Sequence, residues 1–310
     1  MKKKHTIGLA LGSGSARGWS HIGVIRALAD RGIRPDIVCG CSMGALVGAA
    51  YACGHLDGLE AWARQLTTKE ILRLIDFSLR SGGLIQGEKL MASLSQHIDD
   101  VDIASLSLPF GAVAVDLDAG REHWFQEGPL PDAVRASIAL PGVFTPALCD
   151  GRWMVDGGLL NPVPVSMCRA MGADIVIAVN LNGELVGRHA RFAGRETRLS
   201  LALPENEFFR KISEGLAPLK ERVQSILPEN NSRKRTPNLF EVTVGSIDIM
   251  QDRITRSRLA GDPPEVLVSP RLGHMGLLEF ERAEEAIEEG MAAVETADAA
   301  GGLRAFDMEA

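Results

Sequence analysis

The stretch Gly40-Cys41-Ser42-Met43-Gly44 decides the fold, because its serine stands between two glycines at the junction of two apolar runs. The preceding run, Asp36–Cys39, is short and rich in β-branched residues, which predicts a buried strand. The following run, Ala45–Cys53, is rich in alanine and predicts a buried helix. A Gly-x-Ser-x-Gly motif on a strand-to-helix turn is the setting of a nucleophile elbow, in which a tight turn exposes the serine hydroxyl. Ser42 is therefore a candidate nucleophile.

A second glycine-rich segment, Gly12–Gly18, lies upstream and follows the apolar run Thr6–Leu11. The run predicts the first strand, and the spacing of apolar residues predicts a helix from Trp19 to Arg31. The order is strand, glycine-rich loop, helix, strand, serine turn, helix. It predicts an α/β fold with a mostly parallel central sheet and helices on both faces.

The rest of the chain alternates strand and helix patterns. Strands are expected at 110–117, 121–126, 152–155, 174–180 and 264–269; helices are expected at 57–65 (capped by Asp57), 69–79, after Gly87, and at 130–140, 162–171, 204–227, 238–259 and 277–291. Residues 5–180 are expected to form the core. Residues 181–310 are expected to form a C-terminal helical extension with one late strand, packed on the same domain after an arginine-rich linker at 187–199. Paired glycines interrupt the helical segment 56–98 and would allow it to move as a lid. We favour the alternative, an ordinary packed helix and loop.

Composition excludes some functions. The 310 residues carry a net charge of −7, which argues against nucleic-acid binding by bulk electrostatics. The five cysteines include no Cys-x-x-Cys pair, which suits reduced thiols in a cytoplasmic protein, and neither they nor the histidines show metal-ligand spacing. No run approaches 18 uninterrupted apolar residues, so we expect no membrane span and leave peripheral contact with the inner face of a membrane open.

Ser42 needs a partner that removes its proton and donors that stabilise the resulting oxyanion. The backbone amides of Gly12–Gly18 are candidate donors, helped by the dipole of the helix that follows. A phosphate cradle is the alternative use of such a loop. We favour the oxyanion hole, because Arg17 stands where a dinucleotide motif needs its third glycine, and because a phosphate cradle leaves the serine elbow unexplained.

The candidate base is a carboxylate. The histidines after Ser42 lie in no evident catalytic context, the best of them being His274 in a glycine-flanked loop. Asp156, by contrast, ends a predicted strand and precedes Gly157 and Gly158, which places its carboxylate on a tight turn at the edge of the sheet. A turn-forming aspartate is the structural alternative, whereas a carboxylate shielded from water beside Ser42 can act as the base directly.

Taken together, these motifs resemble the patatin-like phospholipase family, in its bacterial RssA-type branch. The resemblance covers roughly residues 5 to 180. It rests on the Gly12–Gly18 loop, the Gly40–Gly44 elbow and Asp156-Gly157-Gly158. Residues 136–142 and 161–164 show further similarity.

The resemblance implies a Ser–Asp dyad with no histidine, on a parallel-sheet α/β fold, that cleaves lipid acyl esters without cofactor or metal. By position, Ser42 is the nucleophile and Asp156 the general base. The remaining implied positions are the oxyanion-hole amides of Gly14, Ser15, Ala16 and Arg17 and the motif glycines Gly12, Gly18, Gly40, Gly44, Gly157 and Gly158.

One departure from the family concerns the loop. Ser13 and Ser15 replace glycines of the family's commonest loop; a serine amide still donates where the backbone does not require a positive φ.

The function predicted is a serine acyl hydrolase of the phospholipase A or lysophospholipase type, with a lipid or acyl ester as its partner. A regulatory or lipid-binding protein with a slow or vestigial site is the alternative, and a nucleotide-binding α/β protein is a third.

Overall fold

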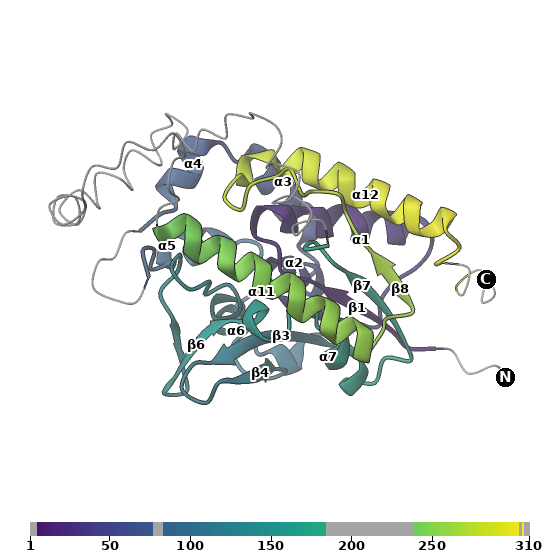
Figure 1. Cartoon of the computed structure of the whole chain (residues 1–310), viewed down its shortest axis with the longest axis horizontal. Helices are drawn as coiled ribbons and strands as arrows, with labels where there is room; N and C mark the ends of the chain where they lie inside the picture. Colours follow the sequence, from purple (N-terminus) through teal and green to yellow (C-terminus); the bar gives the residue numbers. More distant parts are fainter. Residues whose placement is uncertain (1–4, 77–82, 184–238, 304–305, 307–310) are drawn as a thin grey trace, which may run out of the picture.

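The computed structural model describes residues 5–76, 83–183, 239–303 and 306 (Figure 1). The expected helix at 204–227 and the expected linker at 187–199 lie outside these residues. The described chain forms an α/β fold around one mixed, mostly parallel sheet, as the sequence predicted.

The sheet has eight strands whose hydrogen-bonded neighbours run β5-β6-β3-β2-β1-β7-β8, with β4 also paired to β3. The strands are β1 Ile7–Leu11, β2 Ile37–Cys41, β3 Phe110–Asp116, β4 Arg121–Phe125, β5 Ala147–Cys149, β6 Arg152–Asp156, β7 Ile175–Val179 and β8 Val266–Val268. The pairs β1–β2, β1–β7, β2–β3 and β7–β8 are parallel, whereas β4 and β6 run antiparallel to β3. Parallel strands leave their carboxyl ends, and the loops that follow them, at one edge of the sheet, where α/β proteins place their sites.

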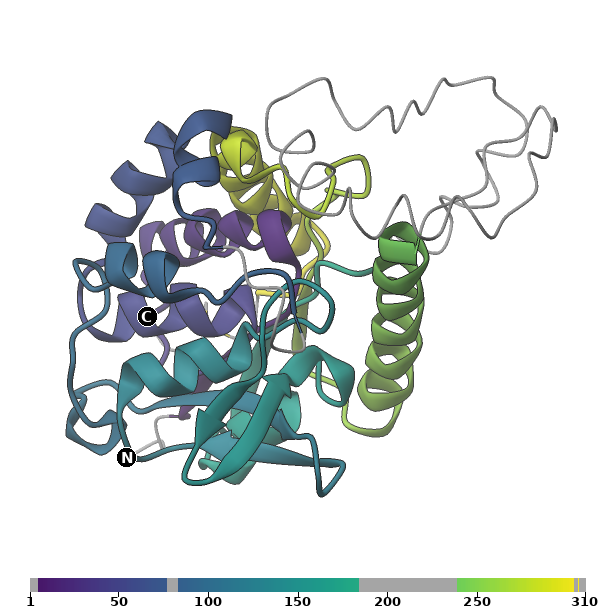
Figure 2. The same ribbon diagram turned by 90° about the vertical axis from the view of Figure 1, so that its left-hand side faces the viewer.

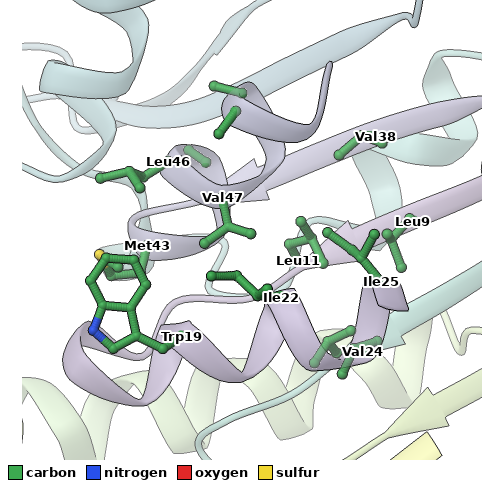
Figure 3. Close-up of a cluster of buried hydrophobic side chains, with 14 of the residues drawn as sticks. Leu9, Leu11, Trp19, Ile22, Val24, Ile25, Val38, Met43, Leu46 and Val47 are labelled. Atoms are coloured by element: carbon green, nitrogen blue, oxygen red, sulfur yellow. The ribbon is translucent and has the colours of Figure 1, made fainter. Parts of the chain in front are cut away.

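Helices cover both faces of the sheet, which explains why the central strands read as unbroken apolar runs. Strand residues alternate between two cores: Leu9 and Leu11 of β1 belong to the larger core, whereas Ala10 between them belongs to the smaller one. Figure 3 shows the larger core, where Leu9 and Leu11 meet side chains of the first two α-helices. These are α1 Ser20–Asp30 and α2 Met43–Ala52. On the opposite face, α7 Val165–Ala170 supplies Met167 and Cys168 to the smaller core.

The remaining helices surround this core. They are α3 Leu56–Gln65, α4 Thr68–Arg73, α5 Glu88–Leu94, α6 Leu130–Ser137, α11 Leu239–Gly261 and α12 Ala283–Ala299, with 3-10 turns η1 Ser15–Trp19, η2 Ile103–Ser105, η3 Gly157–Leu159 and η5 Phe280–Arg282. Among the described residues, no helix combines the length and the apolar character that crossing a bilayer requires.

Two elements from the C-terminal part of the chain, β8 and α12, pack directly against elements that precede them in the sequence. Strand β8 extends the sheet beyond β7, and α12 lies alongside α1, as the upper part of Figure 1 shows. The two helices approach closely because each has a glycine at the crossing: a Cβ on Gly23 would lie 1.9 Å from the carbonyl oxygen of Ile287, and a Cβ on Gly290 would lie 2.1 Å from that of Ser20. Helix α11 packs against η3 and runs along one side of the molecule (Figure 2).

Several element boundaries differ from the predictions for local reasons. Asp57 lies in the first turn of α3, and His55 occupies the N-cap position, so the predicted Asp57 cap was wrong. Helix α4 ends at Arg73, and its cap is a Thr67–Glu70 capping box that the prediction missed. The acidic helix expected from Leu277 begins as α12 at Ala283, because η5 occupies the preceding residues.

Candidate active site

Ser42 lies on a strained turn at the carboxyl end of β2. Its φ of 55° is in the left-handed region, an uncommon conformation for a residue with a side chain. The flanking glycines make the turn sterically possible: a Cβ on Gly40 would lie 2.4 Å from the amide nitrogen of Ala45, and a Cβ on Gly44 would lie 2.1 Å from the carbonyl oxygen of Leu11. The elbow predicted from Gly40–Gly44 is thus present in the structure.

The turn is also held by a residue to which the sequence assigned no role. The backbone amide of Ser42 donates a 2.9 Å hydrogen bond to Ser137 Oγ, which donates in turn to the carbonyl oxygen of Val113 at 2.7 Å. Ser137 is fully buried at the end of α6. Its segment, 136–142, resembles the family, but nothing in that pattern indicated the contact with the elbow.

Asp156 lies beside Ser42 because β6, which ends at Asp156, and β2, which precedes Ser42, both pair with β3. In the register of the sheet, Cys41 of β2 pairs with Val113, and Asp156 of β6 pairs with the next residue, Ala114. Strand β4 pairs with β3 over 112–116, so β2 and β6 follow one another along its other edge. The carboxyl end of β6 therefore lies next to the carboxyl end of β2, where the turn that contains Ser42 begins.

The two side chains form a short hydrogen bond: Ser42 Oγ donates to Asp156 Oδ2 at 2.6 Å. The other carboxylate oxygen, Oδ1, accepts the backbone N–H of Gly158 at 2.7 Å, which fixes the orientation of the carboxylate. Gly157 is required for the turn to pack, because a Cβ there would lie 2.2 Å from the carbonyl oxygen of Val113. A serine hydroxyl bonded directly to a buried carboxylate is the arrangement that base-assisted nucleophilic attack needs.

Burial raises the pKa of Asp156 from 3.8 to about 6, although the hydrogen bonds from Ser42 and Gly158 oppose the shift. Asp156 is 1% exposed. A buried carboxylate that loses its proton only near neutral pH is a stronger base than an exposed one. Asp156 is therefore ionised at pH 7 and basic enough to accept the proton of a hydroxyl during attack.

The glycine-rich loop faces the dyad. Its course depends on Gly12 and Gly18, where a Cβ would lie 2.5 Å from the carbonyl oxygen of Val179 and 2.3 Å from Met43 Cβ respectively. Gly14 has an extended φ of 176°, and Ser15 has a φ of 50°. The condition set from the sequence, a backbone that does not require a positive φ, is therefore not met at Ser15: the loop places this serine in the left-handed region, where a glycine would bear no strain.

The four amides expected to form the oxyanion hole are not equivalent. Ala16 N donates to the carbonyl oxygen of Leu277 at 3.1 Å, and Arg17 N donates to that of Gly14 at 3.2 Å. The amides of Gly14 and Ser15 have no hydrogen-bond acceptor among the described residues, and both residues line the cavity that contains Ser42. Of the four amides, those of Gly14 and Ser15 are therefore the two that are not engaged by other described residues.

The dyad opens into an apolar cavity of about 130 Å³. Its wall includes Met43 and Leu46 of α2. It also includes side chains of α3 and the residue that caps it, of α4, α5 and α11, and of the 277–280 segment, among them Trp62, Leu66, Ile71, Leu90, Ile247 and Phe280. Such a wall can bury an alkyl chain, because each methylene removed from water gains about 0.8 kcal/mol.

The described histidines have other partners. His21 is fully buried and bonds the carbonyl oxygen of Gly12 at 2.7 Å, and burial lowers its pKa to about 4. His55 bonds Asp99, and His274, the best candidate from sequence, bonds Glu285 at 2.5 Å. His123 contacts Phe125, and none of the described histidines lines the cavity at Ser42. His189 lies outside the described residues.

Metal-ligating residues do not gather in the described parts of the chain. No group of three His, Cys, Asp or Glu side chains there is placed to hold a metal ion. The polar groups next to Ser42 are a carboxylate, hydroxyls and backbone amides.

The chain is similar in sequence to a known family and to several known proteins. Residues 9–169 match the family model described as patatin-like phospholipase. A Mycobacterium tuberculosis protein described as an uncharacterized NTE family protein is 38% identical over 98% of this chain and 92% of its own length. The human patatin-like phospholipase domain-containing protein 6 is 35% identical over 58% of this chain, a match that spans 14% of the human protein. The solved structure of VipD from Legionella pneumophila covers 96% of this chain and 67% of its own, at 13% identity and a TM-score of 0.43.

Proposed function

This chain belongs to the patatin-like phospholipase family, and from that premise we propose that it is a carboxylic ester hydrolase whose catalytic dyad is Ser42 and Asp156. The observation that carries the proposal is the 2.6 Å hydrogen bond from Ser42 Oγ to the buried Asp156 carboxylate, at one end of an apolar cavity. The substrates proposed are phospholipids, lysophospholipids and related acyl esters.

In the first half of the reaction, Ser42 Oγ attacks the ester carbonyl carbon while Asp156 Oδ2 takes its proton. The carbonyl oxygen becomes negative and accepts hydrogen bonds from the amides of Gly14 and Ser15. The tetrahedral intermediate collapses as the ester C–O bond breaks. The departing alkoxide takes the proton from Asp156 and leaves as the alcohol, so Ser42 carries the acyl group.

In the second half, Asp156 takes a proton from water, whose oxygen attacks the acyl-enzyme carbonyl. The same two amides stabilise the second oxyanion. The bond to Ser42 Oγ then breaks, and the serine recovers its proton from Asp156. The products are a fatty acid and an alcohol, and the dyad returns to its starting state.

The cavity supports an acyl chain as the group bound beside the dyad. Aliphatic side chains and two tryptophans, Trp19 and Trp62, form much of its wall. The polar side chains in the lining are those of Ser13, Ser15, Ser42, Asp156, Asp248 and Gln251. Such a wall favours an extended hydrocarbon over a charged head group.

The experiment compares four proteins on p-nitrophenyl butyrate and on a panel of phospholipids and lysophospholipids. We expect Ser42→Ala and Asp156→Asn each to reduce kcat to background while the protein stays folded by circular dichroism. His274→Gln is the control and should behave as wild type, because His274 lies outside the cavity. A fluorophosphonate probe should label the wild type at Ser42 and not label Ser42→Ala.

Full turnover by either dyad variant would overturn the proposed mechanism. A wild-type protein that binds lipid but neither turns over an ester nor reacts with the probe would favour the regulatory, lipid-binding alternative.

A further inference from the structure

Helix α11 buries polar side chains, and not only the apolar Ile247, on the side that faces the dyad. Gln251, Asp252 and Thr255 are at most 5% exposed, and Gln251 lines the cavity that contains Ser42. The helix lies outside residues 9–169, the part that matches the family model. A buried amide this close to a reactive centre calls for an explanation other than packing.

The partner of Gln251 is one of the two serines that replace glycines in the loop. Ser13 Oγ donates to Gln251 Oε1 at 3.2 Å and accepts a hydrogen bond from Asn182 Nδ2 at 3.3 Å. All three side chains are buried, so these bonds do not compete with water. A glycine at position 13 would have no hydroxyl to form either bond.

Gln251 also lies against Gly158, in the turn that follows Asp156. A Cβ built on Gly158 would lie 2.4 Å from Gln251 Nε2 and 3.0 Å from Asp156 Oδ1, so the amide and the carboxylate converge on this glycine. The side chain of Gln251 thus lies between the glycine-rich loop and the turn that carries Asp156.

A second serine ties the loop to the same C-terminal part of the chain. Ser15 Oγ donates to the carbonyl oxygen of Leu277 at 2.6 Å, and that oxygen also accepts Ala16 N. The residues on either side of Gly14 are therefore both fastened to C-terminal segments by side-chain hydroxyls.

We propose that Gln251 is a positioning residue: through Ser13 it fixes the glycine-rich loop against the Asp156 turn, so that the amides of Gly14 and Ser15 point at the ester carbonyl attacked by Ser42. The inference rests on the proposed function and adds α11 to the machinery of that site. Oxyanion donors act only within a narrow range of distance, and a loop with few side chains needs external contacts to stay in place.

The first test measures the loop itself and does not depend on activity. Hydrogen–deuterium exchange is followed in peptides that cover residues 12–18, for wild type, Gln251→Met, Ser13→Ala and the double variant. Methionine keeps the length of glutamine and removes the hydrogen bond. We expect faster exchange in these peptides for all three variants, and no change for the control Met250→Ala, whose side chain is 47% exposed on the same helix.

The second test measures catalysis on p-nitrophenyl butyrate. Gln251→Met should lower kcat about three- to tenfold, the effect of losing one neutral hydrogen bond, with KM unchanged. Ser13→Ala should lower kcat at least as much, because it removes the bond to Gln251 and the bond from Asn182. The double variant should be no slower than Ser13→Ala, because that substitution already removes the bond between Ser13 and Gln251. Met250→Ala should retain the wild-type kcat.

Gln251→Glu separates positioning from simple packing. The carboxylate still accepts the Ser13 hydroxyl, so kcat at high pH should recover relative to Gln251→Met. Its negative charge near Asp156 disfavours ionisation of that group, so the acid limb of the pH–rate profile should move to higher pH. Gln251→Met should leave the acid limb in place.

Loop exchange equal to wild type in Gln251→Met and Ser13→Ala would overturn the inference, as would kinetic effects that simply add in the double variant. Failure of the proposed function looks different. A wild-type protein without hydrolysis or probe labelling would contradict the catalytic assignment, while the exchange experiment would still decide whether Gln251 holds the loop.

Discussion

Ser42 and Asp156 lie 114 residues apart in the chain, yet their side-chain oxygens are 2.6 Å apart. The contact is built by the sheet, in which β2 and β6 use the same edge of β3 one after the other. Because the carboxylate is buried and meets the hydroxyl directly, the protonation of one group should govern both reaction rate and stability.

The rate should depend on pH through Asp156. A base works only when ionised, and burial raises the pKa of this carboxyl to about 6. We therefore expect kcat/KM for a p-nitrophenyl ester to rise about tenfold per pH unit below pH 6 and to level off above it. A stopped-rate assay from pH 4.5 to 8.5 measures this. A profile that is flat down to pH 4.5 would contradict the assignment of Asp156 as base.

Asp156→Asn should stabilise the protein at neutral pH while abolishing activity. The pKa of Asp156 is raised in the folded state, so between about pH 3.8 and 6 the folded protein binds more protons than the unfolded chain, and stability falls as pH rises through this window. The free-energy cost of burying the charged carboxylate is fully present above pH 6 and absent below pH 3.8. An uncharged asparagine avoids this cost. The free energy of unfolding should therefore rise by at most about 3 kcal/mol at pH 8, since one pKa unit is worth about 1.4 kcal/mol.

Urea unfolding of Asp156→Asn at pH 8 and at pH 4 measures the difference. Asp118, which is exposed, provides the control: Asp118→Asn should leave the free energy of unfolding nearly unchanged at both pH values. A stability gain in Asp156→Asn that is equally large at pH 4 would show that the charge is not its origin.

Gly290→Ala should destabilise the fold through the crossing of α1 and α12. The new Cβ would lie 2.1 Å from the carbonyl oxygen of Ser20, and neither backbone can retreat without separating the helices. We expect a loss of about 1–3 kcal/mol. Gly245→Ala is the matched control in α11, where a Cβ meets nothing within 4 Å, and helix propensity predicts a small gain. Thermal unfolding of both variants gives the comparison.

Leu66→Trp should shorten the acyl chain that the protein prefers. Leu66 is nearly buried in the cavity wall, and a tryptophan there occupies space available to an alkyl chain. In the wild type, kcat/KM should rise about fourfold per added methylene as each becomes buried, until the cavity is filled. The rise should stop at a shorter ester in Leu66→Trp, measured on esters from acetate to decanoate. Leu148→Trp, at an exposed position outside the cavity, should keep the wild-type series.

Much of the sheet could be predicted because its signals are local. The elbow and the loop are marked by glycines, and the apolar runs of β1, β3 and β7 are bounded by turns. Strand β5 was missed because three residues carry no periodicity, and its place depends on pairing with β6.

The supports of the site were harder to predict than the dyad. Ser137 contacts the elbow from 95 residues away, and Gln251 contacts Ser13 across 238 residues. Neither pair has a sequence pattern, because a single hydrogen bond between distant elements constrains one residue type at each end and nothing between them.

The interlocking of α12 with α1 has a consequence for synthesis of the chain on the ribosome. Helix α1 emerges early, but the groove that receives Gly290 stays uncovered until translation has passed residue 290. Loop residues 13–16, translated first, likewise wait for Gln251 and Leu277. A nascent chain should therefore gain a fully braced loop only after residues 251 and 277 have left the ribosome, far behind the loop itself.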